Sequence, residues 1–404
     1  MTTAERPDNQ PNAAADDERD ERDPVLIAAI RDTIAPTGRI TFAQFMDLAL
    51  YHPTHGYYRV RAERPGRGGD FLTAPELSPF FGICLARQLH ETWQLLGQPN
   101  PFTVLEYGAG GGRLAQDILA AAQAEAPAFA AALRYRLHET NPHRRASARA
   151  LLDASGLSAA TSDEDPVSPL DTAPFVGAII TNEFADALPV HRVIGNPDGT
   201  IRERYVRWDD AQAWFAEELD EPSTPHLAAA LAAALVTLQA DQSAEISLAA
   251  HDWLIAAAAR LSRGLILTID YGYPTAELYA PKRRDGTFLC YYRHTANDAP
   301  FTHIGQQDMT AHVDFGALER AGAVAGLRTL GFTTQGHFLT NLGLGDLLLA
   351  TQTPGRALDA YLTDRAAVLA LIEPGGMGRF GVLAQGKDFA PAAPLRGFGP
   401  LVHR

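Results

Sequence analysis

A glycine-rich turn preceded by an acidic residue is the part of the sequence best suited to chemistry. Glu106, Gly108, Gly110 and Gly112 recur at every second position, between an apolar strand-like run and a helical one. Glycine permits positive φ angles and the close approach of a ligand to the backbone, and the following helix offers free N–H groups at its N-terminus. The pattern therefore predicts a nucleotide-type cofactor at this turn.

Two cofactor classes use such a turn, and the glycines alone do not separate them. The register Gly110-x-Gly112-x-x-Ala115 satisfies the dinucleotide pattern that holds a pyrophosphate. The register from Glu106 to Gly112 satisfies the acid-x-G-x-G-x-G pattern of enzymes that bind S-adenosylmethionine (SAM). A carboxylate repels a pyrophosphate but attracts the ammonium and sulfonium groups of SAM, so we favour SAM and keep a nicotinamide dinucleotide as the alternative. Glu139, at the end of the next strand, is placed to accept hydrogen bonds from the ribose of either cofactor.

Three polar residues at the end of a later apolar run form the second candidate group. They are Asn182, Glu183 and Asp186. A methyl acceptor must be held in line with the methyl group, and a guanidinium, which is always protonated, needs carboxylates to orient it and to help its proton leave. We assign this role to Glu183, with Asp186 second. The alternative is structural: Asp186 caps a helix and Glu183 interacts with its dipole. Asp270, at the end of another run, either lines the site or makes a structural hydrogen bond.

Strands that alternate with helices are expected to position these groups. Helical periodicity follows the first two of four apolar runs, which span 102–108, 134–140, 177–184 and 264–272. This alternation predicts a parallel sheet covered by helices on both faces. Ligands then bind beyond the carboxyl ends of the strands, where the polar residues lie.

The other segments extend this core. Helical patterns begin near Pro24 and at Thr41, and a Pro-Asp-Gly turn between alternating runs predicts an inserted β-hairpin. Residues 224–263 are rich in alanine and are expected to be helical. The C-terminal part is expected to contain, in order, a helix with a strand, a last strand and a loose tail: 316–338, 377–387 and 388–404.

The composition excludes several classes of protein. The 404 residues are 46% hydrophobic and carry a formal net charge of −14, which argues against a general nucleic-acid binder because a polyanion would be repelled. No apolar run approaches the roughly 20 residues of a membrane-spanning helix. Two cysteines exclude a disulfide scaffold and a cysteine-based zinc cluster, and they fit a reducing compartment. The histidines are scattered without a supporting ligand set, so we predict no metal.

The acidity is concentrated at the N-terminus. Residues 1–24 contain eight acidic residues and three arginines but almost no large apolar side chain, so this segment is expected to be disordered. It lacks the apolar stretch of a signal peptide and is not the arginine-rich, acid-poor type of transit peptide. We therefore expect a cytoplasmic protein.

In their order along the chain, these motifs resemble the MidA family of SAM-dependent methyltransferases, which includes a mitochondrial complex I assembly factor that methylates protein arginine. The resemblance spans roughly residues 38–387. Besides the turn at 106–112 and NEFADALPV at 182–190, it rests on GDFLTAPE (69–76), DYG (270–272), GT (286–287), YRH (292–294), TAHVDF (310–315) and MG (377–378). The strings GDFxTxPE and NEFxDALP are specific, whereas the glycine turn alone would not be.

The resemblance implies a class I SAM-dependent methyltransferase fold, an α/β architecture with a Rossmann-like seven-stranded sheet that contains one antiparallel strand. It also implies an N-terminal helical extension, an inserted hairpin and helix region, and a lid formed by residues 52–80. Asp70, Thr73 and Glu76 of this lid are expected to line the site. Two departures from the family pattern are Ala109, where a proline is usual, and Ala185, where a phenylalanine is usual and the pocket wall depends on it.

The sequence thus predicts an enzyme that transfers the methyl group of SAM to a nitrogen, most simply that of a protein arginine side chain. The turn at 106–112 would bind the methionine moiety, Glu139 the ribose, and Glu183 with Asp186 the acceptor. Two alternatives stay open: a methyltransferase for a small metabolite, and a non-catalytic assembly factor that binds SAM. The resemblance makes a respiratory-complex subunit a candidate partner, and a homodimer stays open. The expected segments are a tail (1–24), an extension with lid (25–100), a methyltransferase domain (101–387) with an insertion at about 190–262, and a C-terminal tail (388–404).

Overall fold

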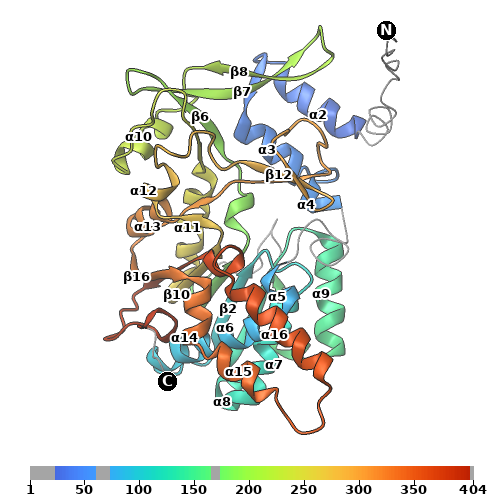
Figure 1. Ribbon diagram of the computed structural model, residues 1–404, viewed down its shortest axis with the longest axis vertical. Helices are drawn as coiled ribbons and strands as arrows, with labels where there is room; N and C mark the ends of the chain where they lie inside the picture. The colour runs from blue at the N-terminus through green and yellow to red at the C-terminus, as the bar shows by residue number, and fades with distance from the viewer. Residues whose placement is uncertain (1–22, 61–72, 165–172, 401–404) are drawn as a thin grey trace, which may run out of the picture.

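The computed structural model describes residues 23–60, 73–164 and 173–400. Nearly all of the acidic tail predicted at 1–24 lies outside the described residues, as does Asp70. In Figure 1 the described chain forms a lower part built on the long strands β2 and β10, and an upper part that contains α2, α3, β7 and β8.

A seven-stranded sheet forms the centre of the lower part. Its strand order is β16-β17-β10-β5-β2-β3-β4, and only β17 runs antiparallel to its neighbours. This confirms the class I methyltransferase fold expected from the sequence. The strands are β2 (Phe102–Tyr107), β3 (Leu133–His138), β4 (Thr161–Glu164), β5 (Phe175–Asn182), β10 (Leu261–Asp270), β16 (Leu327–Thr334) and β17 (Gly381–Lys387).

Helices cover both faces of this sheet because consecutive residues of its central strands point to opposite sides. Val104 and Ile180 pack into one core, whereas Leu105 and Ile179 pack into another. The first face is covered by α6 (Pro79–Leu95), α7 (Arg113–Glu125), α8 (Pro127–Ala132), α9 (Pro142–Ala154), α14 (Gln335–Asn341), α15 (Leu344–Ala350) and α16 (Leu358–Ile372). The second face is covered by α11 (Leu248–Arg260) and α13 (Phe315–Val324).

An antiparallel sheet forms the upper part. The predicted hairpin is present as β6 (His191–Gly195) and β7 (Ile201–Asp209), which are joined by β1 (Arg39–Thr41), β8 (Trp214–Asp220) and β9 (Ser243–Ile246). The expectation that 224–263 is helical throughout is wrong at β9. This short strand pairs with β6, some 50 residues earlier in the chain, and its four residues carry no periodicity of their own.

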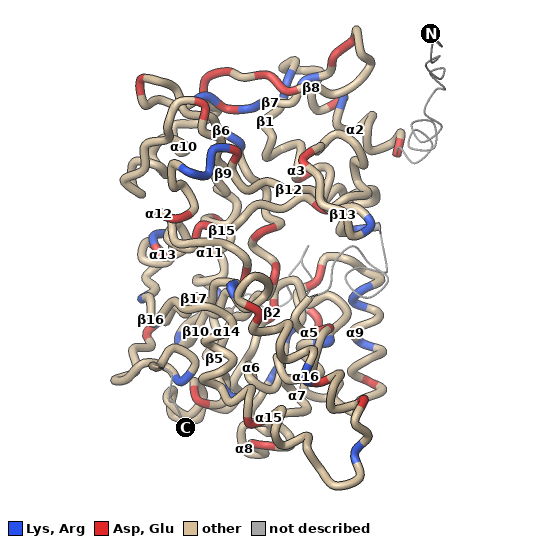
Figure 2. Tube along the Cα trace, viewed as in Figure 1, with Lys and Arg blue, Asp and Glu red and all other residues tan. Residues whose placement is uncertain are grey.

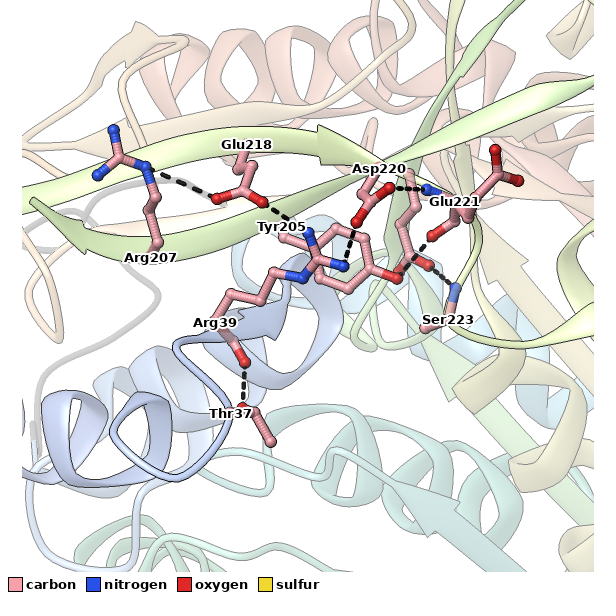
Figure 3. A network of polar contacts seen from close by, with 9 residues as sticks. Thr37, Arg39, Tyr205, Arg207, Glu218, Asp220, Glu221 and Ser223 are labelled. Atoms are coloured by element: carbon pink, nitrogen blue, oxygen red, sulfur yellow. Dashed lines mark hydrogen bonds and ion pairs between the residues drawn. The ribbon is translucent and has the colours of Figure 1, made fainter.

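The N-terminal segment packs on this second sheet. α2 (Pro24–Ile34) and α3 (Phe42–Tyr51) begin where the sequence predicted, the first capped by Asp23 and the second by a Thr41–Gln44 capping box. Their apolar faces share one core with β7 and β8. In Figure 3, Arg39 of β1 lies over the ring of Tyr205 and forms ion pairs with two acids of β8, Glu218 and Asp220.

The remaining elements are short. They are α4 (Tyr57–Val60), α5 (Ala74–Leu77), η1 (Ser158–Ala160), η2 (Ala185–Ala187), α10 (Pro225–Ala233), α12 (Thr275–Leu278), η3 (Met377–Arg379) and η4 (Arg396–Phe398), with the small strand pairs and sheet made by β11 (Gly272–Tyr273), β12 (Leu289–Tyr292), β13 (Thr295–Asn297), β14 (Asp308–Thr310) and β15 (Val313–Asp314).

The C-terminal segment corrects one expectation from sequence. Residues 388–404 were expected to form a loose tail, but in the described residues Phe389 and Leu395 are buried in the core of the first face. The N–H of Gly397 also donates to Oε1 of Gln88 in α6, at 3.0 Å. The prolines of this segment prevent regular structure, but its few apolar side chains suffice to anchor it.

Candidate functional site

A pocket lies beyond the carboxyl ends of β2, β3 and β5, the three adjacent strands at the centre of the main sheet. Tyr51 and Tyr58, from α3 and α4 of the upper part, line it together with residues of the lower part, so both parts contribute. We call this the glycine-turn pocket. Of the predicted residues, it is lined by Thr73, Glu76, Glu106, Gly108, Gly110, Glu139, Asn182 and Glu183.

The glycine turn adopts the backbone conformation that its sequence predicts. Gly108, Gly110 and Gly112 all have positive φ angles, of 70°, 55° and 78°. A Cβ atom on Gly108 would lie 3.1 Å from the ring of Phe184, and one on Gly112 would lie 2.8 Å from Cβ of Ala148 in α9. Gly112 is not among the residues that line the pocket, and its role is to let α7 and α9 pack closely. Gly108 and Gly110 face the ligand position.

Glu106, in β2, is a buried acidic residue. It is 4% exposed and accepts a hydrogen bond of 2.7 Å from the hydroxyl of Tyr135. Burial raises the pKa of Glu106 to about 8, with a further contribution from the nearby Glu139. Among the described residues no lysine, arginine or histidine forms an ion pair with it. A ligand ammonium would satisfy this carboxylate, whereas a pyrophosphate would be repelled by it.

Glu139 joins the glycine turn to the start of α9. One of its carboxylate oxygens accepts from the N–H of Gly110 at 2.9 Å, and the other accepts from the N–H of Asn141 at 2.8 Å. Each oxygen has a further lone pair, so the carboxylate can still accept from ribose hydroxyls. Its second function is therefore to fix the turn against β3. Together, Glu106, the open glycines and Glu139 fit SAM.

Glu183 occupies a strained position at the end of β5. Its φ angle is 50°, a region that residues other than glycine adopt only when the surroundings enforce it. Its Oε1 accepts from the side-chain amide of Asn182 at 3.0 Å and from the N–H of Ala74 at 3.3 Å. The second contact brings the GDFLTAPE and NEFADALPV motifs together. Burial, followed by the charge of Asp186, raises the pKa of Glu183 to about 8.

Asp270 builds the loop that carries Glu183. It is fully buried, and its Oδ2 accepts from three successive backbone N–H groups, those of Phe184 (3.1 Å), Ala185 (2.8 Å) and Asp186 (3.3 Å). The contacts of Asp270 thus match the alternative in which it makes structural hydrogen bonds. A carboxylate that holds three consecutive amides fixes the sharp turn after β5 and, through it, the strained backbone of Glu183.

Asp186 lies next to the site but does not line the glycine-turn pocket. It is 5% exposed, and in the described part of the chain its Oδ1 has no hydrogen-bond partner. Burial raises its pKa to about 6, although a hydrogen bond with Tyr271 acts in the opposite direction. The helix-cap alternative does not describe it, since it sits inside the short helix η2 rather than before it. Its charge adds to burial in raising the pKa of Glu183, and it acts on the site through that residue.

Thr73 and Glu76 form the described edge of the predicted lid. They make a capping box at the start of α5, in which the N–H of Thr73 donates to Oε2 of Glu76 at 3.3 Å. Both residues line the pocket, as the family resemblance implied. Burial raises the pKa of Glu76. Asp70, the third lid residue, cannot be placed because it lies outside the described residues.

A second cavity opens on the other side of Glu183. It has a volume of about 300 Å³ and is lined by three tyrosines, Tyr271, Tyr273 and Tyr291; we call it the tyrosine cavity. Glu183 lines both the glycine-turn pocket and the tyrosine cavity. The other lining residues are Gly272, His312, Gly375, Gly376, Met377, Arg379 and Phe380. One carboxylate thus separates a cofactor-type pocket from an aromatic cavity with room for a second molecule.

Sequence reasoning missed several residues of these two pockets. Tyr51 of α3 and Tyr58 of α4 reach the site through the packing of the upper part on the lower one, whereas Arg144 reaches it from α9 of the lower part. No motif marked Tyr51 or Arg144, and Tyr58 stood only within the range of the expected lid. Tyr271 and His312 stood within strings that carried the resemblance, but nothing local indicated that they share a cavity.

Two further properties bear on the predictions. Within residues 23–60, 73–164 and 173–400, no three histidine, cysteine or acidic side chains are grouped so that they could hold a metal ion. In the same ranges, no helix has the length and apolar character required to cross a bilayer. Figure 2 shows acidic positions in the region between the upper and lower parts, where the two pockets lie.

Comparison with known proteins agrees with this geometry. The family model Methyltransf_28, which describes S-adenosyl-L-methionine-dependent methyltransferases, matches residues 84–333. The mitochondrial protein arginine methyltransferase NDUFAF7 homolog of Drosophila melanogaster is 30% identical, over 84% of this chain and 79% of that protein. The NDUFAF7 of Homo sapiens is 26% identical, over 77% and 71%.

A solved structure extends the comparison to the fold and the cofactor. A Burkholderia thailandensis protein crystallised with S-adenosyl-homocysteine is 35% identical, covers 97% of each chain and superposes with a TM-score of 0.82. Its likeness covers the upper part as well as the main sheet. The nicotinamide alternative is therefore set aside: the chain belongs to the Methyltransf_28 family of SAM-dependent methyltransferases, as its motifs indicated.

Proposed function

We propose that this enzyme methylates a guanidinium nitrogen of an arginine side chain in a protein. The observation that carries the proposal is the position of Glu183, a partly buried carboxylate without a cationic partner among the described residues, between the glycine-turn pocket and the tyrosine cavity. The names of the relatives, which are protein arginine methyltransferases, support the same acceptor.

The charges around the tyrosine cavity favour a cationic acceptor. The charge of Asp186 adds to burial in raising the pKa of Glu183, and the charges of Asp186 and Glu183 do the same for Asp270. The charge of Asp186 also raises the pKa of Tyr271 and of Tyr291, after burial. A guanidinium would satisfy the carboxylate of Glu183, and it can stack on tyrosine rings. A neutral acceptor would leave this group of acids without compensation.

The chain contributes positioning and proton transfer. When bound, SAM supplies an electrophilic methyl group on its sulfonium. Glu183 holds the acceptor guanidinium by charge-assisted hydrogen bonds with one nitrogen directed at the glycine-turn pocket, and its carboxylate takes up the proton that the methylated nitrogen loses. Asn182 donates to Oε1 of Glu183 and so fixes the orientation of the carboxylate. The tyrosines and the Thr73–Glu76 capping box exclude water.

The proposal is tested by incubating the purified enzyme with methyl-labelled SAM and a lysate of cells that lack it. Label in protein that mass spectrometry locates on arginine is the expected result. Label only in the low-mass fraction would favour the small-metabolite methyltransferase instead. No S-adenosyl-homocysteine with any fraction would contradict both and leave a non-catalytic role.

Compartment and partners remain proposals as well. Cys84 and Cys290 are both free and buried, which supports a reducing environment such as the cytoplasm, although the curated relatives are named as mitochondrial proteins. A protein substrate is the partner that the acceptor chemistry requires. Fractionation would test the compartment, and analytical ultracentrifugation would show whether the enzyme forms a homodimer.

A further inference from the structure

Two arginines lie near one aromatic ring of the tyrosine cavity, that of Tyr273. The guanidinium carbon of Arg283 lies 4.0 Å from the centre of the Tyr273 ring, and that of Arg379 lies 5.2 Å from the same centre. Tyr273 and Arg379 both line the cavity. Arg283 comes from the loop after α12 and Arg379 from η3, so two segments about 100 residues apart place like charges at one ring.

Neither of these two arginines is held by an acidic side chain, unlike several others in the described chain. Arg39, Arg87, Arg192, Arg204, Arg207, Arg320 and Arg356 each form an ion pair with an acidic side chain. Neither Arg283 nor Arg379 forms one within the described residues. Arg283 donates its Nε to the carbonyl of Glu277 at 3.0 Å, which fixes the side chain while its terminal nitrogens stay available. Arg379 is exposed.

The charge of Arg283 reaches the cavity. Burial, followed by the charge of Arg283, lowers the pKa of His312 to about 4. His312 lines the cavity, and its ring lies edge-on to Tyr271 and tilted against Tyr273. The cavity wall therefore carries both the carboxylate of Glu183 and the guanidinium of Arg379, and the charge of Arg283 acts on it at His312.

We propose, on the basis of the arginine methyltransferase function above, that Arg283 and Arg379 bind a carboxylate of the substrate close to the methylated arginine. The guanidinium of the substrate lies at Glu183, and an acidic side chain of the same segment lies beside Tyr273, where the two arginines are. Because Glu183 and Tyr273 line one cavity of about 300 Å³, the acidic residue lies within about three positions of the arginine. Guanidinium groups bind a carboxylate through charge-assisted hydrogen bonds.

The first experiment reads the substrate sequence. Proteins labelled by the enzyme in a lysate are digested, and the residues around each methylated arginine are compared with those around all arginines of the same proteins. Enrichment of aspartate or glutamate within three positions is the expected result. Methylated arginines without such enrichment overturn the inference and leave the proposed function intact. Absence of any methylated arginine overturns the proposed function and this inference with it.

The second experiment uses a synthetic peptide from a methylated site. Its acidic residue is changed to glutamine, and the enzyme is changed by Arg379→Gln or Arg283→Gln. Each single change should raise KM for the peptide about tenfold, while kcat and the Kd for SAM stay the same. Combining the peptide change with an arginine change should raise KM little further. Arg284→Gln is the matched control, since Arg284 donates to the carbonyl of Ala240 instead.

A charge exchange keeps the test independent of stability. The Arg379→Glu enzyme should bind the acidic peptide more weakly than the Arg379→Gln enzyme does. It should also methylate a peptide that has lysine in place of the acidic residue. If both arginine variants retain the wild-type KM for the acidic peptide, the two guanidiniums serve only to hold Tyr273, and the proposal is wrong.

Discussion

Carboxylates in the antiparallel sheet of the upper part, which we call the inserted sheet, have basic partners, whereas carboxylates at the two pockets have none among the described residues. In the sheet, Glu203 is fully buried, and its Oε1 lies 2.7 Å from Nδ1 of His191. Glu218 and Asp220 form ion pairs with Arg39 (Figure 3). Burial acts to raise the pKa of Glu203, but hydrogen bonds from His191 and Ser223 bring it below its ordinary value. At the pockets, burial raises the pKa of Glu106 and of Glu183 to about 8, and no ion pair within the described residues compensates it.

This difference separates charges that hold the fold from charges that serve a ligand. A buried carboxylate without a cation costs stability, so its retention indicates a partner that is absent from the chain itself. For Glu106 we propose that this partner is SAM, and for Glu183 that it is a substrate guanidinium. The paired acids of the sheet need nothing further. Substitutions in the two regions should therefore have different and partly opposite effects.

The largest effect is expected for Glu183→Gln. Glutamine keeps the size of the side chain and can still accept the amide hydrogen bonds, but it neither attracts a guanidinium nor takes its proton. We expect kcat to fall by about 100-fold or more, with the Kd for SAM within about twofold of wild type. Radiometric turnover and calorimetry measure the two quantities. Glu218→Gln in the inserted sheet is the matched control and should leave both unchanged.

The next largest effect is expected for Glu106→Gln. A charge-assisted hydrogen bond to the cationic amine of SAM would be lost, which should weaken SAM binding about 10- to 100-fold. Titration calorimetry with SAM and with S-adenosyl-homocysteine measures it. The substituted amide can still accept from the hydroxyl of Tyr135, which keeps the strand packed. Unchanged affinity would show that Glu106 is a structural carboxyl, like those of the sheet.

The pH dependence of activity should show the same carboxylate. The carboxylate form of Glu183 is the active one and its pKa in the free enzyme is about 8, so kcat/KM should rise with pH below 8 by up to about tenfold per unit and then level off. Glu183→Gln should abolish this rise in whatever activity remains. A profile that is flat between pH 6 and pH 8.5 in the wild type would contradict the assignment of Glu183 as proton acceptor.

The polar residues and glycines of the candidate site were easier to predict from the sequence than the elements that form the walls of the two pockets. Glu106, Gly108, Gly110, Glu139 and Glu183 were found because a strand end followed by glycine or by an acid is a local pattern that parallel-sheet topology brings together. No local pattern could indicate that Glu183 would line two pockets, because that depends on its contact with α5, about 100 residues before it, and on η3, about 200 residues after it, which lines the same cavity. Gly112 looked like its neighbours in sequence, and only the distance to Ala148 shows that it serves helix packing.

The smallest effects are on stability, and they should have opposite signs in the two regions. The folded-state pKa of Glu106 is raised from 4.5 to about 8, so the folded protein binds more protons than the unfolded chain and loses stability as pH rises through that interval. Glu106→Gln should therefore raise the Tm of the cofactor-free enzyme by a few degrees at pH 8.5 and change it little at pH 5, whereas Arg39→Gln should lower it by about 1–3 °C at both. Scanning calorimetry at the two pH values measures this, with saturating S-adenosyl-homocysteine expected to remove the advantage of Glu106→Gln. If Glu106→Gln lowered the Tm as Arg39→Gln does, Glu106 would be a carboxyl that the fold needs. The distinction between acids that hold the fold and acids that serve a ligand would then be wrong for Glu106.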